Sequence, residues 1–278
     1  MKEGKVSALI TYNVNPSYSY NKAKEFNVAL KNVALKISTS SYNDETASLM
    51  DYVCPDSHNL ESWGDASPKH GTYSFMQPTI SPLFDTRQFQ ETLLSWTDRS
   101  DYLSFLKNFW IAKGIDWNTT LHDGYFNLED KKLRLKSFID RSKSIKNLSS
   151  TELELELYET IALGDGYQAN NPWLQELPDP LTRACWDNYL TISAHTAKEF
   201  GLENWNVSNG ALNGSLVDIE ADGISLKNVP VLISPGQAKS TVGMAIGYGR
   251  TKAGKAGDGI GFNAYPFTGK KSISIKKV

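Results

Sequence analysis

The residues best suited to chemistry form a glycine-rich run near the C-terminal end of the sequence. Gly249-Arg250-Thr251-Lys252-Ala253-Gly254-Lys255-Ala256 matches a phosphate-binding P-loop as far as its Gly-Lys pair. Ala256, however, stands where a P-loop has the Ser or Thr that binds Mg²⁺, and the glycine-rich residues after it make a poor helix start. We therefore expect a mobile, basic hairpin rather than a nucleoside-triphosphate site, although it could still contact a phosphate-bearing ligand or an acidic partner.

Four carboxylates near the N-terminus are a second candidate for chemistry: Asp44, Glu45, Asp51 and Glu61. Two carboxylates whose pKa values differ can share acid–base catalysis. The same residue types also cap helices and tie down loops. Their spacing favours the structural role and leaves catalysis open.

Metal and thiol chemistry have little support in this sequence. It holds only Cys54 and Cys185, and His58 is the one histidine close to either of them. Iron–sulfur clusters and structural zinc sites usually take four such ligands. We expect two reduced, buried thiols, with a Cys54–Cys185 disulfide or a single thiolate ligand as alternatives. No Gly-x-Ser-x-Gly motif marks a serine hydrolase.

The composition is that of a folded protein. The 278 residues are 40% hydrophobic, and 29 basic against 31 acidic residues give a net charge of −2. This balance argues against disorder and against a non-specific nucleic-acid binder. No apolar run approaches the ~20 residues of a membrane span, and the first residues do not form a signal peptide.

Apolar periodicity predicts alternating strands and helices in the first 55 residues. We expect strands over 5–12 and 33–37, an extended segment over 51–55, and helices over 22–31 and 46–52. This order implies parallel strands in an α/β layer. Ligands of such layers gather at the loops after the strands, which here are loops 13–20, 38–46 and 55–65.

The middle of the chain shows fewer signals. Residues 56–88 predict a long irregular segment that is functional or wrapped across a partner surface. A helical pattern runs over 86–110, with Asp98 or Ser100 as the cap of its second helix. Residues 126–150 are basic and polar and predict a connector with a solvated face.

Residues 151–278 predict an all-β domain. Residues 151–161 could begin with a capping box, but Leu and Glu alternate strictly, and this period of two favours a strand. Residues 164–180 read as coil and 194–201 as a short helix ended by glycine. Further strands are expected over 186–192, 215–220, 224–227, 229–233, 243–247 and 272–277. Many short strands separated by turns indicate a barrel.

Several segments resemble a known family. "NVNPSYSY", "YNDETASLMDYVCPDSHNLESWGD" and "YSFMQPTISPLFDTRQFQETLLSW" are similar to the third domain of molybdopterin oxidoreductases of the dimethyl-sulfoxide-reductase superfamily. "GDGYQANNPWLQELPDPLTRACWDNYLTIS", "VPVLISPGQAKSTVGMAIGYGR" and "GIGFNAYPF" resemble that superfamily's C-terminal dinucleotide-binding domain, and "WIAKGIDWNTTLHDGYF" fits the connection between the two. "ANNPWLQELPDP" together with "ESWGDASPKHG" is most similar to the large iron–sulfur subunit of bacterial alternative complex III.

The resemblance implies an α/β fold, α+β overall. A Rossmann-like parallel α/β domain over 1–126 and a connector over 127–150 would precede a double-psi β-barrel over 151–278. It also implies that the chain is a piece of a longer subunit, whose cluster-binding and metal-ligating regions have no counterpart here. The residues that would face the former cofactor cleft are Asn13, Asn15, Thr46, Asp51, Asn170, Asn171, Trp173, Tyr248, Arg250 and Asn263. No catalytic or metal-binding residue is assigned.

Two functional hypotheses follow from the resemblance. The first is a cofactor-less scaffold in a membrane-bound, quinol-oxidising electron-transfer complex. The second is part of an active oxidoreductase of the polysulfide- or thiosulfate-reductase type, gripping molybdopterin guanine dinucleotide. In both, the partners are the rest of the parent subunit, with its iron–sulfur clusters, and other subunits of a respiratory complex. Neither requires nucleic acid or direct membrane insertion. The implied location is the periplasmic face of the inner membrane, and no catalysis is expected from this chain alone.

Overall fold

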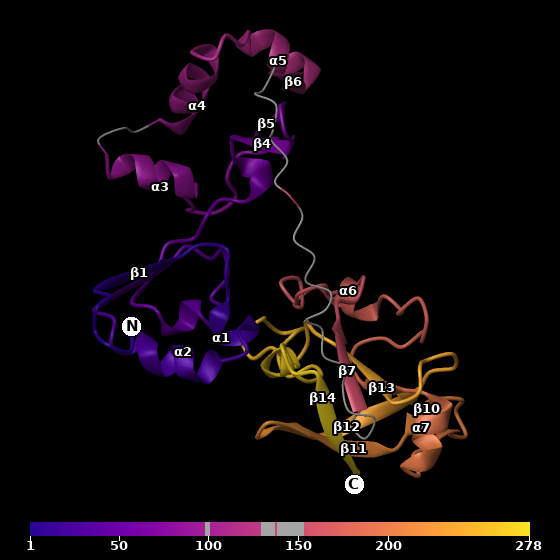
Figure 1. The fold of residues 1–278 in the computed structure, drawn as a ribbon. Helices are drawn as coiled ribbons and strands as arrows, with labels where there is room; N and C mark the ends of the chain where they lie inside the picture. Colours follow the sequence, from indigo (N-terminus) through magenta and orange to yellow (C-terminus); the bar gives the residue numbers. More distant parts are fainter. Residues whose placement is uncertain (98–100, 129–136, 138–152) are drawn as a thin grey trace.

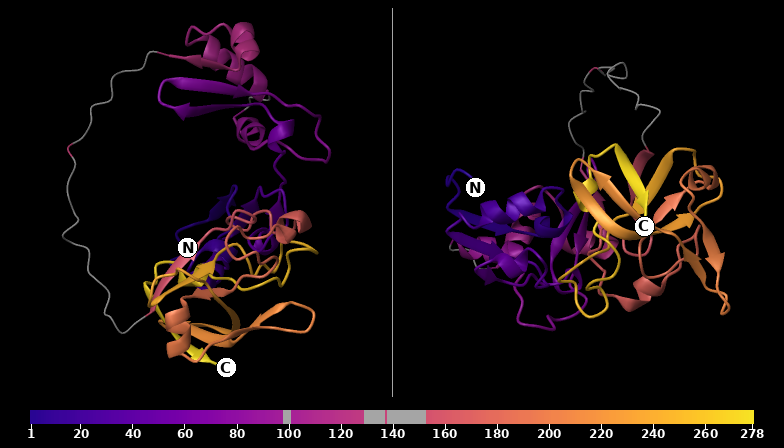
Figure 2. Two further views of the ribbon diagram at one scale, coloured as in Figure 1. Left: turned by 90° about the vertical axis from the view of Figure 1, so that its right-hand side faces the viewer. Right: turned by 90° about the horizontal axis from the view of Figure 1, so that it is seen from below.

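The computed structural model of the chain describes residues 1–97, 101–128, 137 and 153–278. Figure 1 shows two sheet-containing parts at the N-terminal side and a β-barrel at the C-terminal side. Figure 2 shows that the barrel lies beside the most N-terminal part and away from the helices of residues 89–123. Among the described residues, no helix is long and apolar enough to cross a membrane.

The first part is a small parallel sheet with helices. Strands β1 (Ala8–Thr11), β2 (Leu35–Ser38) and β3 (Tyr52–Val53) pair in that order, all parallel. The connections hold α1 (Pro16–Ser19), α2 (Ala23–Leu30) and the 3₁₀ turn η1 (Ala47–Leu49). The expected strands and the helix expected over 22–31 are therefore present, whereas the helix expected over 46–52 is only the 3₁₀ turn η1. The strands are short, however, and β3 is exposed rather than buried.

The second part contains structure where an irregular segment was expected. Residues 56–88 hold the turn η2 (Asn59–Glu61) and a hairpin of β4 (Gly64–Lys69) and β5 (Thr72–Met76), which β6 (Tyr125–Asn127) extends into an antiparallel sheet. The helices are α3 (Phe89–Ser95), α4 (Tyr102–Ile111) and α5 (Trp117–Asp123). The sequence did not predict the hairpin because its composition is largely polar. The aromatic side chains of β5 that stabilise it do so by packing on the helices, which local patterns do not reveal.

An aromatic core holds this second part together. Trp110 and Trp117 are buried, and Phe75 lies 4.7 Å from the ring of Trp117. The indole Nε1 of Trp110 donates to the Asp65 carboxylate at 2.8 Å, which satisfies the buried polar atom. The N-cap of α4 is Asp101, whereas the expected caps, Asp98 and Ser100, lie outside the described residues, as does most of the expected connector 126–150.

The third part is a closed barrel of six strands. The strand order is β11-β12-β8-β13-β7-β14, in which β7 pairs with β13 and β8 with β12 in parallel. The bounds are β7 Leu153–Tyr158, β8 Leu190–Ile192, β11 Leu216–Ala221, β12 Ile224–Ile233, β13 Thr241–Ala245 and β14 Ser272–Lys277. In β7, Leu153 and Leu155 are buried and Glu154 and Glu156 exposed, so the strand prediction for this segment is confirmed.

Short elements complete the barrel region. The predicted helix over 194–201 is α7 (Ala194–Glu199). The coil expected over 164–180 is wrong in part, because Asn171 caps a short helix, α6 (Pro172–Glu176). A two-stranded ribbon of β9 (Asn204–Asn206) and β10 (Leu212–Gly214) was not expected, and η4 (Tyr265–Phe267) precedes the last strand.

Both cysteines depart from the expectation of burial. Cys54 and Cys185 are free and exposed, so the disulfide alternative is also wrong. Cys54 follows the exposed strand β3, and Cys185 lies in the loop after α6, where its Sγ donates to the carbonyl of Glu176 at 3.2 Å. Free cysteines are usually buried, but these two lie beside an exposed strand and in a surface loop, so both are exposed.

The barrel core makes a direct prediction about stability. Phe267 is 1% exposed and packs in the barrel core, whereas Phe84 is 79% exposed. We expect Phe267→Ala to lower the free energy of unfolding by ~3–5 kcal/mol, because it leaves a cavity, and Phe84→Ala by no more than ~0.5 kcal/mol. Urea unfolding followed by far-UV circular dichroism measures both. Equal losses in the two variants would contradict the assigned core.

Candidate functional site

A buried ion pair joins the first part of the chain to the barrel. The Arg250 guanidinium donates to the Glu45 carboxylate through Nε (2.9 Å to Oε1) and Nη2 (2.8 Å to Oε2). The two side chains are only 6% and 10% exposed. Glu45 lies in the loop after β2 and Arg250 in the loop after β13, 205 residues apart. The pair is therefore a tertiary contact that fixes how the two parts meet.

Further donors surround the same carboxylate. Glu45 Oε1 also accepts from the backbone amides of Thr251 (2.8 Å) and Lys252 (3.1 Å), and Oε2 accepts from Asn15 Nδ2 (2.7 Å). Burial raises the pKa of Glu45, but the hydrogen bonds from Arg250, Asn15 and Thr251 outweigh it and bring the pKa to about 2. Glu45 is thus an anion at any physiological pH.

A polar network in the first part holds Glu45 in place. Asn15 Oδ1 accepts from both the amide (3.1 Å) and the hydroxyl (2.6 Å) of Thr46. The Thr46 hydroxyl in turn accepts from the Ser17 amide at 3.0 Å. Asp44 Oδ1 accepts from the amides of Thr46 and Ala47 at the start of the η1 turn. These hydrogen bonds join the loop after β1 to Thr46 in the loop after β2, directly next to Glu45.

Tyr18 forms the second half of the same contact. The Arg250 guanidinium lies 4.7 Å from the centre of the Tyr18 ring, a cation–π contact. The Tyr18 hydroxyl donates to the Tyr248 carbonyl at 2.8 Å, and the Tyr18 carbonyl accepts from Asn263 Nδ2 at 3.2 Å. Burial raises the pKa of the Tyr18 phenol. Figure 1 shows α1, which carries Tyr18, beside the C-terminal loops of the barrel.

A large cleft opens next to this contact. It has a volume of about 1730 Å³ and lies between the first two parts of the chain and the loops of the barrel. Its lining is acidic: against Arg250 and Lys252 stand six carboxylates, those of Asp44, Asp56, Glu61, Asp65, Asp85 and Asp165. Arg250 is already paired with Glu45. The field in the cleft therefore disfavours anions.

The residues that the resemblance implied for the cofactor cleft fall into three groups. Those that line the large cleft are Asn13, Asn15, Asn170, Asn171 and Arg250. Thr46 and Asn263 lie in the contact between the first part and the barrel. Asp51, which pairs with Lys36 at 3.0 Å, and Trp173, which is 81% exposed, lie outside the lining, and Tyr248 faces a different pocket. Their role in binding a cofactor stays a prediction.

Sequence reasoning missed the part that two residues play in this contact. Tyr18 was not singled out, and Glu45 was expected to serve as a cap or catalytic group. Another carboxylate of the predicted group does serve a structural role: Glu61 closes a capping box with His58 and accepts a hydrogen bond from the Leu83 amide. The sequence placed Glu45 in one of the loops where ligands were expected, but this position does not indicate that Arg250 is its partner.

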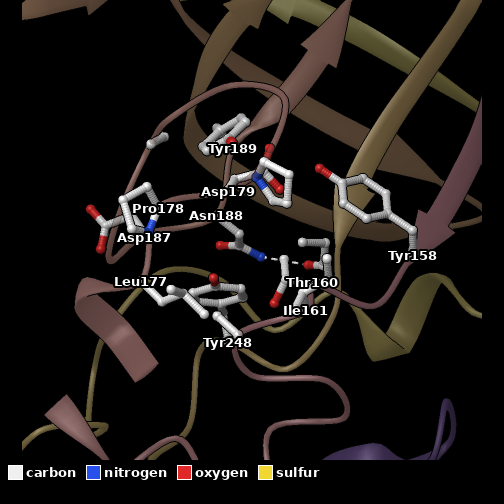
Figure 3. A pocket seen from close by; sticks show the side chains of 14 residues that line it. Tyr158, Thr160, Ile161, Leu177, Pro178, Asp179, Asp187, Asn188, Tyr189 and Tyr248 are labelled. Atoms are coloured by element: carbon white, nitrogen blue, oxygen red, sulfur yellow. Dashed lines mark hydrogen bonds between the residues drawn. The ribbon is translucent and has the colours of Figure 1, made fainter. Parts of the chain in front are cut away.

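The pocket that Tyr248 faces is small and lies at one end of the barrel (Figure 3). Its volume is about 150 Å³, and Tyr158, Tyr189 and Tyr248 line it together with Asp179. Burial raises the pKa of the Tyr189 and Tyr248 phenols. Asn188 closes the floor and is fully engaged: its Nδ2 donates to the carbonyls of Ala245 and Phe262, and its Oδ1 accepts from the Phe262 amide.

Within the described residues, no three His, Cys, Asp or Glu side chains come together in a group that could hold a metal ion.

Fold and site together define a mixed α+β protein with a closed six-stranded barrel, an architecture compatible with molybdopterin enzymes. No protein-family model matches the chain. It is similar to the "Menaquinone reductase, molybdopterin-binding-like subunit" of Nitratidesulfovibrio vulgaris, with 25% identity over 280 residues, 92% of this chain and 38% of the relative. Among solved structures it shares its fold with acetylene hydratase from Pelobacter acetylenicus, with a TM-score of 0.66 and 15% identity over 98% of this chain and 44% of that one.

These comparisons confirm the resemblance to molybdopterin oxidoreductases that the sequence motifs predicted. The chain spans less than half the length of either protein. The narrower resemblance to alternative complex III stays a prediction, as does the double-psi path of the barrel.

The buried ion pair predicts a large effect of one substitution. We expect Arg250→Ala to lower the free energy of unfolding by ~3–5 kcal/mol, because it leaves the Glu45 carboxylate buried without its counter-charge. The matched control is Lys227→Ala, which removes the cation of the exposed Lys227–Asp218 pair and should change stability little. Chemical unfolding compares the two. Similar small effects would mean that the Glu45–Arg250 contact carries no stability.

The depressed pKa of Glu45 predicts a pH dependence. The folded chain holds this pKa at about 2, against 4.5 for the ordinary group, so the stabilisation is complete above about pH 5 and is lost as the pH falls towards 2. The free energy of unfolding of the wild type should exceed that of Glu45→Gln by an amount that shrinks by on the order of 3 kcal/mol over this range. Unfolding curves at stepped pH measure it. A difference that does not change with pH would contradict the assigned charge state.

Proposed function

We propose that this chain is part of a molybdopterin oxidoreductase-like iron–sulfur subunit and acts as a scaffold without the molybdopterin cofactor. In this role it supports a membrane-bound, quinone-linked electron-transfer complex rather than catalysing a reaction itself. The observation that carries the proposal is the Glu45 carboxylate, which occupies the donors that a phosphate-bearing dinucleotide would need at this contact.

The residues present do not fit such a cofactor. A pyrophosphate needs free cationic and amide donors, yet Arg250 and the amides of Thr251 and Lys252 already bind Glu45. The six carboxylates of the cleft add repulsion for a ligand of the same charge. Lys252 is the cation of the lining that is not paired with Glu45, and it cannot offset six negative charges.

The partners follow from the relative. The name of the Nitratidesulfovibrio vulgaris protein describes a subunit of a menaquinone reductase, which supports a place for this chain among other subunits of an electron-transfer complex. The sequence motifs predicted a quinol-oxidising complex of the alternative complex III type at the periplasmic face of the inner membrane. A scaffold serves a quinone-linked complex in either direction of electron flow, so we retain the periplasmic complex as part of the proposal.

A second function is favoured by the size of the cleft. Pockets for small molecules usually measure ~300–1,000 Å³, and this cleft, at about 1730 Å³, has room for a dinucleotide. Asn13, Asn15, Asn170 and Asn171 line it with amide groups suited to hydrogen-bonding a base or a pterin. This is the alternative of an active oxidoreductase of the polysulfide- or thiosulfate-reductase type, with molybdopterin guanine dinucleotide as its cofactor.

Elemental analysis of the purified parent subunit decides between the two. The scaffold predicts molybdenum and tungsten far below stoichiometry, and no pterin fluorescence after oxidative extraction. As a parallel measurement, guanosine diphosphate is titrated into this chain and the thermal midpoint followed; the scaffold predicts no saturable shift. Stoichiometric metal with extractable pterin would establish the active oxidoreductase instead.

A further inference from the structure

We propose that the loop of residues 249–256 is an oxyanion receptor of the phosphate-binding type, which the chain keeps closed by inserting its own Glu45 carboxylate. The ligand class is a phosphate or pyrophosphate group, which competes with Glu45 for the same donors. This inference deepens the proposed scaffold role, since it explains why a loop that resembles a P-loop does not present its donors to the cleft.

Backbone geometry supports a receptor rather than a simple ion pair. Four successive amides of the loop point at carboxylate oxygens: those of Thr251 and Lys252 donate to Glu45, and those of Ala253 and Gly254 donate to Asp258 at 2.6 and 3.0 Å. The amides of Thr251 and Lys252 share one oxygen of Glu45, and those of Ala253 and Gly254 share one oxygen of Asp258. Two successive amides that share an anionic acceptor form an anion-binding nest. An ion pair with Arg250 alone would need none of them.

Two glycines give the loop this shape. Gly249 and Gly254 have φ values of +67° and +123°, which favour glycine. A Cβ atom on Gly249 would lie 2.1 Å from the amide nitrogen of Asn263, and one on Gly254 would lie 2.5 Å from the Asn170 side chain. The loop is therefore packed against neighbours that depend on both glycines, so the nest is built into the fold.

The donor chemistry around Glu45 is that of a phosphate site. The guanidinium donates to both carboxylate oxygens, Nε to Oε1 and Nη2 to Oε2. Two backbone amides share Oε1, and Asn15 Nδ2 donates to Oε2. The side chains of Lys252 and Lys255 are exposed beside the loop and would neutralise a second phosphate charge. Glu45 supplies one negative charge and two acceptor oxygens. A phosphate group offers more of both to the same donors.

Competition explains why Glu45 holds the receptor in the wild type. A side chain tethered next to its partner behaves as a ligand at ~mM concentration or higher, so a free anion must exceed that to displace it. Displacement would also break the bridge between the first part of the chain and the barrel, because Glu45 and Arg250 come from opposite sides of the contact.

Removal of the tethered carboxylate tests the inference. In the 278-residue chain, we expect Glu45→Ala to bind pyrophosphate, without added metal, at least ~10-fold more tightly than the wild type. Calorimetry at matched ionic strength gives the affinity. Changes in the amide chemical shifts of Thr251 and Lys252 show where pyrophosphate binds, because a general effect of charge would not be confined to these two amides. The control is Asp218→Ala, which removes a partly exposed carboxylate that pairs with Lys227 and should leave pyrophosphate binding as in the wild type.

A second variant keeps the test decisive if Glu45→Ala does not fold. Glu45→Gln retains the side-chain size and removes the charge, and pyrophosphate should raise its thermal midpoint more than that of the wild type. The inference is overturned if folded Glu45→Ala shows no saturable response at Thr251 and Lys252, if Glu45→Gln and the wild type respond equally, or if the wild type or Asp218→Ala binds as tightly as Glu45→Ala. Molybdenum in the parent subunit would refute the scaffold yet leave this comparison unaffected, so the two failures are distinguishable.

Discussion

The way the N-terminal sheet meets the barrel depends on one buried carboxylate and the donors around it. An ion pair taken out of water gains little by itself, because the loss of hydration cancels much of the attraction. Here Asn15 and two backbone amides add hydrogen bonds to Glu45 beyond those of the Arg250 guanidinium, and charge-assisted hydrogen bonds are the stronger kind. Four of these donors, Nε and Nη2 of Arg250 and the amides of Thr251 and Lys252, come from the barrel side, so the contact constrains how the two parts meet as well as adding stability.

Local patterns in the sequence predicted most individual elements. The alternation of Leu and Glu around β7 and the apolar spacing of α2 are decided within a few residues, and both are present. The hairpin of β4 and β5 was missed because its polar composition resembles a loop and its aromatic face has meaning only once α4 and α5 pack on it. The helix α6 was missed because five residues carry too little periodicity.

The site was less accessible to sequence reasoning, for a physical reason. The resemblance to a family predicted that a set of residues faces a cofactor cleft, and this stays a prediction. Among them, those that line the large cleft of the structure are Asn13, Asn15, Asn170, Asn171 and Arg250. Nothing local, however, joins Glu45 to Arg250 across 205 residues, since each alone reads as an exposed charge or a loop anchor. Tyr18 was missed for the same reason: its hydroxyl meets the Tyr248 carbonyl only after the two parts have docked.

A likeness of fold also does not fix the chemistry of a site. The barrel is maintained by apolar residues such as Ile192 and Val217, which do not contact the cleft, so polar residues of the cleft can change without loss of the architecture. A site that has lost a phosphate ligand must still satisfy its buried donors, because an unpaired buried donor costs ~1–3 kcal/mol and a buried charge more. An internal carboxylate meets this requirement for Arg250 and the loop amides together. If the chain is the scaffold that we propose, Glu45 is what the proposed phosphate-type receptor needs in order to remain folded without a bound phosphate.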